Sequence, residues 1–409
     1  MMPLIRSDRS WSNHRTSLLL LVLAGSAILL SQGCASVPKR HPLPTEYLEE
    51  AEIPGIERAR AWGDTEPKWA DQWFALNDEE LQEMYPAGYG KSHHYLAISG
   101  GGAKGAFGAG LLKGWTELGT RPEFQIVTGI STGALTAPFA FLGPEYDDTL
   151  EEMFTHYSTK DMVDKRNLFN TLTSDAAAST KKLEALIGKY VDEDVLAALT
   201  AEAARGRQLF IGTTNLDAER PVVWRVSTIA ASGEPKALDL IRKIILASAS
   251  IPVAFPPVAF EVEANGQLYD ELHVDGGTSS QVFLYPALMD WARVVKELKV
   301  PEPPHVYVIR NSRLDPHAAV VDRKLLPIAG KTIASLIRTQ GVGDLYRIYA
   351  LAQRDGLDFN LAFMPATFTD IPDEVFDPVW MRKLFDLGYE MGKSGYHWRK
   401  GPPQFEPAE

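Results

Sequence analysis

Hydrophobic and polar positions divide the central part of the chain into alternating strands and helices. The apolar run Tyr95–Ile98 is typical of a short strand, and apolar residues from Phe107 to Trp115 recur at helical spacing after it. A second run, Phe124–Val127, leads through a glycine-flanked turn into a small-residue helix predicted over Ala134–Leu142. Two such units in succession predict an α/β fold with a mostly parallel sheet and helices on both faces. The active crevice of such a sheet lies at the carboxyl ends of its strands.

The same periodicities predict the elements that follow. Helices are expected over 147–157, 181–190, 194–204 and 238–249, and strands over 208–212, 222–224, 258–262, 268–274 and 305–309. Asn265-Gly266 predicts a hairpin turn within the last group of strands. Residues 158–180 mix charged and apolar side chains, which fits either a flap over the crevice or an ordinary surface insertion. Residues 316–395 are predicted to form amphipathic helices.

The first 33 residues are predicted to be a secretory signal and not part of the fold. They begin with basic residues, and the uncharged run Leu18–Leu30 is too short to span a bilayer comfortably. Cys34 follows at once and is the only cysteine in the chain. It is either a stray thiol near a cleavage site or the lipidated residue of a bacterial lipoprotein, and its position after an apolar segment favours lipidation. We therefore expect a lipid-anchored protein of the cell envelope, on the outer membrane or a periplasm-facing membrane if the cell is Gram-negative.

Composition narrows the possible partners. The hydrophobic content of 45% is that of a globular protein, and the formal net charge of −12 argues against nucleic acid, which calls for clustered lysine and arginine. It also argues against attachment to anionic membranes through a basic surface. Residues 35–90 are rich in Pro, Glu and Trp. Their start is predicted to be a tether, and their tryptophans are expected to pack the segment against the domain more readily than to mark a membrane-facing edge.

The turn Gly129-Ile130-Ser131-Thr132-Gly133 carries the first candidate chemistry. The flanking glycines tolerate a sharp strand-to-helix turn that exposes Ser131 at a helix N-terminus, where a nucleophilic serine would lie. The five-residue pattern alone also occurs in ordinary loops, so the strand and the helix around it decide its meaning.

The loop Gly100-Gly101-Gly102-Ala103-Lys104-Gly105 formally matches a dinucleotide fingerprint, so a nucleotide-binding oxidoreductase is an alternative function. That fingerprint also requires an acidic residue at the end of the second strand, whereas Glu123 precedes the strand here. Phosphate-loop chemistry is disfavoured because a Gly-Lys-Ser/Thr sequence is missing. The remaining interpretation is an oxyanion hole, in which consecutive glycines direct backbone N–H groups toward one spot.

Two bases are possible for Ser131. A Ser–Asp–His triad could use Asp275 with His305 or His317, in the chain order of α/β-hydrolases. Neither histidine lies in a distinctive loop, whereas Asp275 ends an apolar strand and precedes two glycines. An aspartate in an apolar site, with a raised pKa, can act as the base directly. Asp-Gly-Gly on its own would be an ordinary turn.

Taken together, these motifs resemble the patatin-like phospholipase family. The resemblance rests on the glycine loop at 100–105, the serine turn at 129–133 and Asp275-Gly276-Gly277. A further match is the stretch Ala247–Pro257, and the likeness covers about residues 93–310. The chain departs from the family pattern at Thr278–Gln281, where asparagine and proline are common, and at Lys104, where arginine is commoner.

The resemblance implies a three-layer α/β/α sandwich that hydrolyses lipid acyl esters with a Ser–Asp dyad. It implies Ser131 as the nucleophile, Asp275 as the base and Gly100, Gly101, Gly102 and Lys104 as the oxyanion loop, without a metal or an organic cofactor. We expect a phospholipid or lysophospholipid substrate. The predicted organisation is a signal peptide (1–33), a lipidated tether and N-terminal extension (34–92), a patatin-like catalytic domain (93–315) and a helical C-terminal extension packed on it (316–409).

Overall fold

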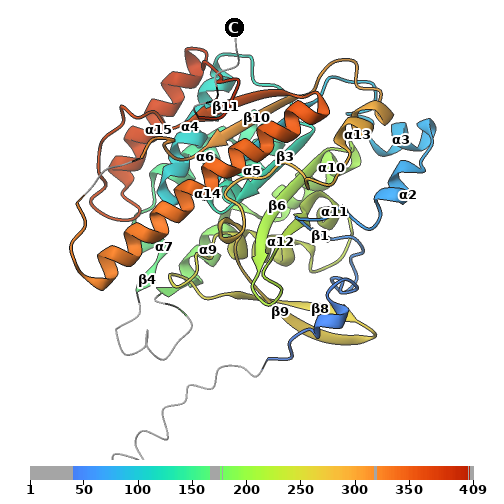
Figure 1. Cartoon of the computed structure of the whole chain (residues 1–409), viewed down its shortest axis with the longest axis horizontal. Helices are drawn as coiled ribbons and strands as arrows, with labels where there is room; N and C mark the ends of the chain where they lie inside the picture. The colour runs from blue at the N-terminus through green and yellow to red at the C-terminus, as the bar shows by residue number, and fades with distance from the viewer. Residues whose placement is uncertain (1–39, 166–175, 177, 317–319, 404, 406–409) are drawn as a thin grey trace, which may run out of the picture. The chain divides into compact units, whose positions relative to one another are not determined.

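A nine-stranded sheet organises the chain in the computed structural model, which describes residues 40–165, 176, 178–316, 320–403 and 405. The sheet belongs to the unit Pro42–Glu409 (Figure 1). The predicted signal and Cys34 lie outside the described residues, as does His317.

Most of the central strands run parallel. The order across the sheet is β1 (Arg60–Trp62), β7 (Arg220–Arg225), β6 (Gln208–Asn215), β3 (Ile126–Ile130), β2 (His94–Ile98), β10 (His305–Arg310) and β11 (Asp358–Phe363). The strands from β6 to β11 are parallel, whereas β7 is antiparallel to β6 and β1 to β7. A hairpin of β8 (Val258–Ala264) and β9 (Gln267–Asp275) joins the sheet through β6. The hairpin turn lies at Asn265 and Gly266, as the sequence predicted, and both residues have positive φ.

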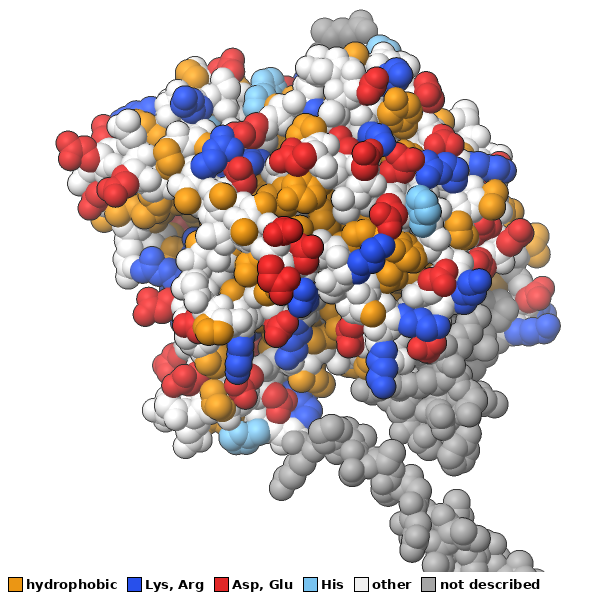
Figure 2. All heavy atoms as spheres, turned by 180° about the vertical axis from the view of Figure 1, so that it is seen from behind, with side chains coloured by type: hydrophobic (Ala, Val, Ile, Leu, Met, Phe, Trp, Pro, Cys, Tyr) orange, Lys and Arg blue, Asp and Glu red, His pale blue; other side chains and the backbone are white. Residues whose placement is uncertain are grey.

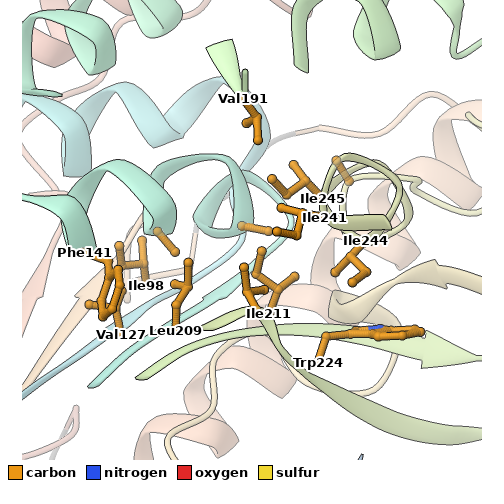
Figure 3. Packing of buried hydrophobic residues seen from close by; sticks show 14 of the residues in the cluster. Ile98, Val127, Phe141, Val191, Leu209, Ile211, Trp224, Ile241, Ile244 and Ile245 are labelled. Atoms are coloured by element: carbon orange, nitrogen blue, oxygen red, sulfur yellow. The ribbon is translucent and has the colours of Figure 1, made fainter. Parts of the chain in front are cut away.

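Helices cover both faces of this sheet. Alternate strand residues point to opposite faces, so each strand contributes to two cores. One core joins Ile98, Val127 and Leu209 to helices on the first face. The helices that contribute to this core include α4 (Gly105–Glu117), α5 (Thr132–Leu142), α6 (Asp147–Thr155), α12 (Ala237–Ser248) and α15 (Pro378–Lys393). Figure 3 shows the strand residues packed against Phe141 of α5 and Ile241 of α12.

The second core lies under α13 (Trp291–Glu297) and α14 (Leu325–Asp355), where Val306 and Val308 of β10 pack against Leu345 and Ile348. The predicted three-layer α/β/α class is confirmed. The remaining helices are α2 (Ala70–Phe74), α3 (Asp78–Met84), α7 (Thr159–Met162), α9 (Lys181–Tyr190), α10 (Glu193–Ala204) and α11 (Val226–Ala230). The short hairpin β4 (Asp164–Lys165) and β5 (Ala178–Ser179) lies in the segment that was predicted to be either a flap or an insertion, and most of that segment is outside the described residues.

Two segments contribute more to the sheet than their patterns indicated. Residues 316–395 were predicted to be helical throughout, but they include β11, which pairs in register with β10. The prediction was wrong there because a short, fully buried strand carries no alternation and is easily taken for part of a helix. Strand β1 extends the opposite edge, and Arg60 on it forms a buried ion pair with Glu271 of β9.

The tryptophans of the N-terminal extension contact the domain, as predicted. Trp73 packs in a small cluster with Leu81, Val294 and Leu298, so α2 and α3 are attached to α13. The indole N–H of Trp73 donates to the Tyr85 hydroxyl at 2.8 Å.

The contact between α4 and α15 depends on glycines that let the two backbones touch. A Cβ on Gly114 would collide with the carbonyl oxygen of Tyr389, which cannot move independently of its helix. Gly114→Ala is therefore expected to lower the free energy of unfolding by about 3 kcal/mol. The thermal midpoint measured by circular dichroism tests this, with Gly188→Ala on α9 as the control. A Cβ at Gly188 would meet nothing within 4 Å, so that change should be neutral or slightly stabilising, and equal midpoints would contradict the prediction.

The surface carries both signs of charge. On the face drawn in Figure 2, Lys and Arg are interspersed with Asp and Glu, and hydrophobic side chains show between them. Within the described ranges, no helix is both long enough and apolar enough to cross a bilayer.

Candidate active site

Ser131 lies in the strained turn between β3 and α5. Its φ of 56° and ψ of −121° fall in a region that residues with a side chain rarely adopt, and such strain is found mainly at functional sites. Glycines on either side make the turn possible. A Cβ on Gly133 would collide with the carbonyl of Ile98, and a Cβ on Gly129 would collide with the carbonyl of Gly133. The backbone N–H of Ser131 donates to the Ser248 hydroxyl at 2.9 Å, which in turn donates to the Gly212 carbonyl at 2.7 Å.

The topology brings Asp275 to the same place. On one edge, β6 pairs with β3 as far as Ile130 opposite Gly212, and then with β9 from Thr213 onward. Both strands must use this edge because β7 occupies the other along these residues. Strand β9 therefore ends where β3 has turned away into Ser131, and its last residue, Asp275, lies opposite Thr213 and next to the serine.

The two side chains are hydrogen-bonded. The Ser131 hydroxyl pairs with the Asp275 carboxyl, which also accepts the Gly277 N–H at 2.7 Å. Both residues are buried, Ser131 being 8% and Asp275 5% exposed. Burial raises the pKa of Asp275 to about 6, against the lowering effect of these two hydrogen bonds. A carboxyl with this pKa is ionised at neutral pH and still basic enough to take up a proton.

The glycine loop between β2 and α4 lies against Ser131, since a Cβ on Gly100 would be 3.1 Å from the Ser131 Cβ. Its amides are not equivalent. The Gly100 N–H donates to the Gln281 carbonyl at 3.0 Å and the Lys104 N–H to the Gly101 carbonyl at 3.2 Å. The N–H groups of Gly101 and Gly102 have no acceptor among the described residues. Of the four predicted loop residues, these two thus have amides free for a ligand, and the Lys104 side chain is exposed.

Three residues outside the predicted set support this loop: Asn311 and Gln281 directly, and Asp344 through Gln281. Asn311, after β10, donates from its amide to the Ser99 carbonyl at 3.0 Å and accepts the Gly108 N–H at 3.1 Å. Gln281 contacts the Gly100 amide through its carbonyl and the Gly277 carbonyl through its side chain, at 2.7 Å. Asp344 of α14 accepts the Gln281 N–H at 2.6 Å. Nothing in local sequence marks Asn311 or Asp344, whereas Gln281 lies where the chain departs from the family pattern.

An apolar cavity begins at Ser131. Its walls are almost entirely aliphatic and aromatic, and they come from α5, α6, α9, α12 and the segments around Phe255 and Phe376. The lining side chains include Leu135, Phe139, Met153, Ile187, Ile245 and Phe255. Such a cavity suits a hydrocarbon chain whose reacting end lies at Ser131.

The alternative assignments receive no support from the geometry. His305 lies at the amino end of β10 beside His94, at the opposite end of the sheet from Ser131, and its Nδ1 is 2.7 Å from Asp358. In the part of the chain that is described, no histidine pairs with Ser131. Glu123, the acid nearest to the dinucleotide pattern, forms an ion pair with Arg205 at 2.8 Å. No group of three or more His, Cys, Asp or Glu in the described ranges could hold a metal ion.

A strained serine on a strand-to-helix turn, hydrogen-bonded to a buried aspartate beside a glycine loop, is an arrangement typical of serine hydrolases. The family comparison is more specific: residues 96–288 match the model of the patatin-like phospholipase family. The resemblance drawn from the motifs is thereby confirmed over this range.

Other comparisons are more distant. No curated protein matches the chain. The crystal structure of VipD from Legionella pneumophila is similar with 13% identity and a TM-score of 0.37. The match covers 74% of this chain and 66% of VipD, just under two thirds of its length. At that distance the likeness bears on neither fold nor function.

Proposed function

We propose that this protein hydrolyses fatty-acyl esters of phospholipids or lysophospholipids through a Ser131–Asp275 dyad. The observation that carries the proposal is the meeting of Ser131 and the buried Asp275 carboxyl where β3 and β9 adjoin on one edge of β6. The family match over residues 96–288 supports the reaction class, and the apolar cavity at Ser131 supports a fatty-acyl substrate.

In the acylation step, the Ser131 oxygen attacks the ester carbonyl carbon while its proton passes to Asp275. The carbonyl oxygen becomes an oxyanion, which would accept hydrogen bonds from the N–H groups of Gly101 and Gly102. Each such donor contributes about 3 kcal/mol in the transition state. Collapse of the tetrahedral intermediate expels the lysolipid or glycerol alcohol, which takes the proton from Asp275, and leaves the acyl group on Ser131.

Deacylation reverses these roles. A water molecule loses a proton to Asp275 and attacks the acyl-enzyme carbonyl, and the same N–H groups receive the second oxyanion. Collapse breaks the ester bond to Ser131, which regains a proton from Asp275, and the fatty acid departs. The base acts twice without a histidine, because its pKa of about 6 lets the carboxyl both accept and return a proton near neutrality.

The membrane attachment is part of this proposal. Lipidation of Cys34 would hold the domain at the cell envelope, close to lipid substrate, and the start of the segment 35–90 would serve as the tether. Mass spectrometry of the N-terminal peptide from the membrane fraction tests for acyl chains on Cys34. An unmodified thiol there would remove the anchor but not the reaction.

Covalent labelling tests the reaction directly. A fluorophosphonate is expected to add a single adduct to the peptide containing Ser131 and to abolish hydrolysis of a medium-chain nitrophenyl ester. Peptide mapping locates the adduct, and pre-incubation with a phospholipid substrate should slow its formation. An adduct on another serine, or full activity after labelling of Ser131, would contradict the assignment.

A further inference from the structure

A second, larger cavity lies far from Ser131. It has a volume of about 740 Å³ and is bounded by the first residues of β2, β3 and β6, including Tyr95, Ile126 and Gln208. Ser131 follows the other end of β3, and five strand residues separate the two ends by about 16 Å. No residue lines both cavities. Whatever occupies this space is therefore not the ester undergoing hydrolysis.

The walls of this cavity are mainly aromatic, and much of them comes from the N-terminal extension. We call it the aromatic cavity; its principal side chains are Trp62, Trp69, Trp73, Tyr85, Phe210 and Trp291. The tryptophans of the extension thus cover the sheet without filling the space beneath them. A cavity of this size is in the range of pockets that enclose a small organic molecule.

Arg225 supplies an unbalanced positive charge to the aromatic cavity. It ends β7, and its guanidinium is partly buried, donating to the Arg58 carbonyl at 3.3 Å. Both guanidinium groups lie near the Trp69 ring, with centroid distances of 5.1 Å for Arg225 and 5.9 Å for Arg58. Arg58 also donates to the Gln72 side chain. Within the described residues neither arginine forms an ion pair with a carboxylate.

The other charged groups at the cavity do not cancel this charge. Arg207 is paired with Glu202 at 2.7 Å and is already neutralised. Glu57 also borders the cavity, but its side chain is exposed to solvent. Burial lowers the pKa of Arg225, and Arg58 lowers it further, against a raising effect of Tyr85. Buried charges are normally paired, so this arrangement favours an anionic partner.

We propose that the aromatic cavity binds a long-chain aliphatic carboxylate, with the carboxylate on Arg225 and Arg58 and the chain along the tryptophan wall. Arginine binds a carboxylate through two parallel N–H groups, and the apolar walls account for the chain. The binding site itself does not depend on the proposed hydrolysis. That hydrolysis would release such an acid, so the site is placed to hold a product of the enzyme. Because the extension forms one wall, a bound acid would also fasten the extension to the sheet.

Laurate, kept below its micelle concentration, is a suitable probe. Binding is measured on the full chain carrying Ser131→Ala, by tryptophan fluorescence and by calorimetry. Laurate is expected to change the fluorescence saturably and to raise the thermal midpoint, because it binds only the folded chain. Dodecanol, which has the same chain without the charge, should bind at least tenfold more weakly. Equal affinity for laurate and dodecanol would overturn the role of the arginines.

Variants locate the site. Arg225→Gln should weaken laurate binding at least tenfold, and Arg58→Gln, at an exposed position where folding is not at risk, at least threefold. Arg205→Gln, a surface arginine outside both cavities, should leave the affinity unchanged. Two results would place laurate in the catalytic cavity and refute the proposal. One is laurate binding that survives both Arg225→Gln and Arg58→Gln. The other is laurate binding that disappears when an alkyl fluorophosphonate occupies Ser131 in the unsubstituted chain. Failure of the labelling reaction would refute the proposed hydrolysis alone, since laurate binding requires no turnover.

Discussion

Asp275→Asn is expected to lower kcat for ester hydrolysis by about a thousandfold or more. Asparagine has nearly the same shape and can keep the Gly277 N–H contact, but it cannot accept the proton of Ser131. Loss of general base catalysis alone costs about 10²- to 10⁴-fold, and here the same group acts in both half-reactions. Steady-state kinetics on a nitrophenyl ester and on a defined phospholipid measure the effect.

The matched control is Asp192→Asn. Asp192 caps α10 by accepting the Val195 N–H at 3.0 Å, and asparagine caps a helix equally well. Activity of this variant should equal that of the unchanged protein. If Asp275→Asn kept more than a tenth of the activity, another group would have to be the base.

Lowering the pH should reduce the activity of the unchanged protein in the way that Asp275→Asn does. The pKa of Asp275 is about 6, so activity should fall tenfold per pH unit below that value, as the carboxyl becomes protonated, and level off above it.

The contribution of Asp275 to the free energy of unfolding should change with pH in the opposite direction to the activity. The folded pKa exceeds the ordinary value of 3.8, so the stabilisation from a neutral Asp275 is complete below about 3.8 and lost as pH rises through 6. At pH 8 the ionised carboxylate costs up to about 3 kcal/mol, so Asp275→Asn should be no less stable than the unchanged protein. A variant that is both inactive and unfolded would not support the dyad.

Ser131→Ala is expected to reduce kcat by about 10⁴-fold or more, because no covalent intermediate can form. The substitution removes only a hydroxyl, so the Ser131 N–H contact to Ser248 and the strained turn should persist. Ser232→Ala serves as the control, since that hydroxyl bonds the Ile229 carbonyl far from the site.

The double variant, Ser131→Ala with Asp275→Asn, distinguishes a dyad from two independent groups. Residues that act as one unit are not additive, so the double variant should be no slower than Ser131→Ala by more than about threefold. Losses that multiply would show that Asp275 acts on the reaction separately from Ser131.

Local sequence was sufficient to predict the individual turns and strands near the site. The glycine-flanked turn predicted the backbone around Ser131, because only glycine allows the helix to pass so close to β2. Asn265-Gly266 predicted the hairpin that ends in Asp275, and the apolar runs predicted the parallel strands. These signals are local: each depends on conformational freedom or periodicity within a few residues.

Only the tertiary structure decided which side chains meet at the site and which backbone amides already have a hydrogen-bond acceptor. The sequence could not show that Gly100 gives its amide to Gln281, or that Asn311 and Asp344 hold the loop, because those partners lie far away in the chain. It could not show β11, whose buried strand has no period of its own. The uncompensated charge of Arg225 is likewise a property of what surrounds it. Hydrogen-bond satisfaction and charge pairing depend on neighbours in space, whereas turns and periodicities depend on neighbours in the chain. The sequence alone therefore determined the turns and strands of this protein, and only the tertiary structure determined its hydrogen-bond partners and its unpaired charge.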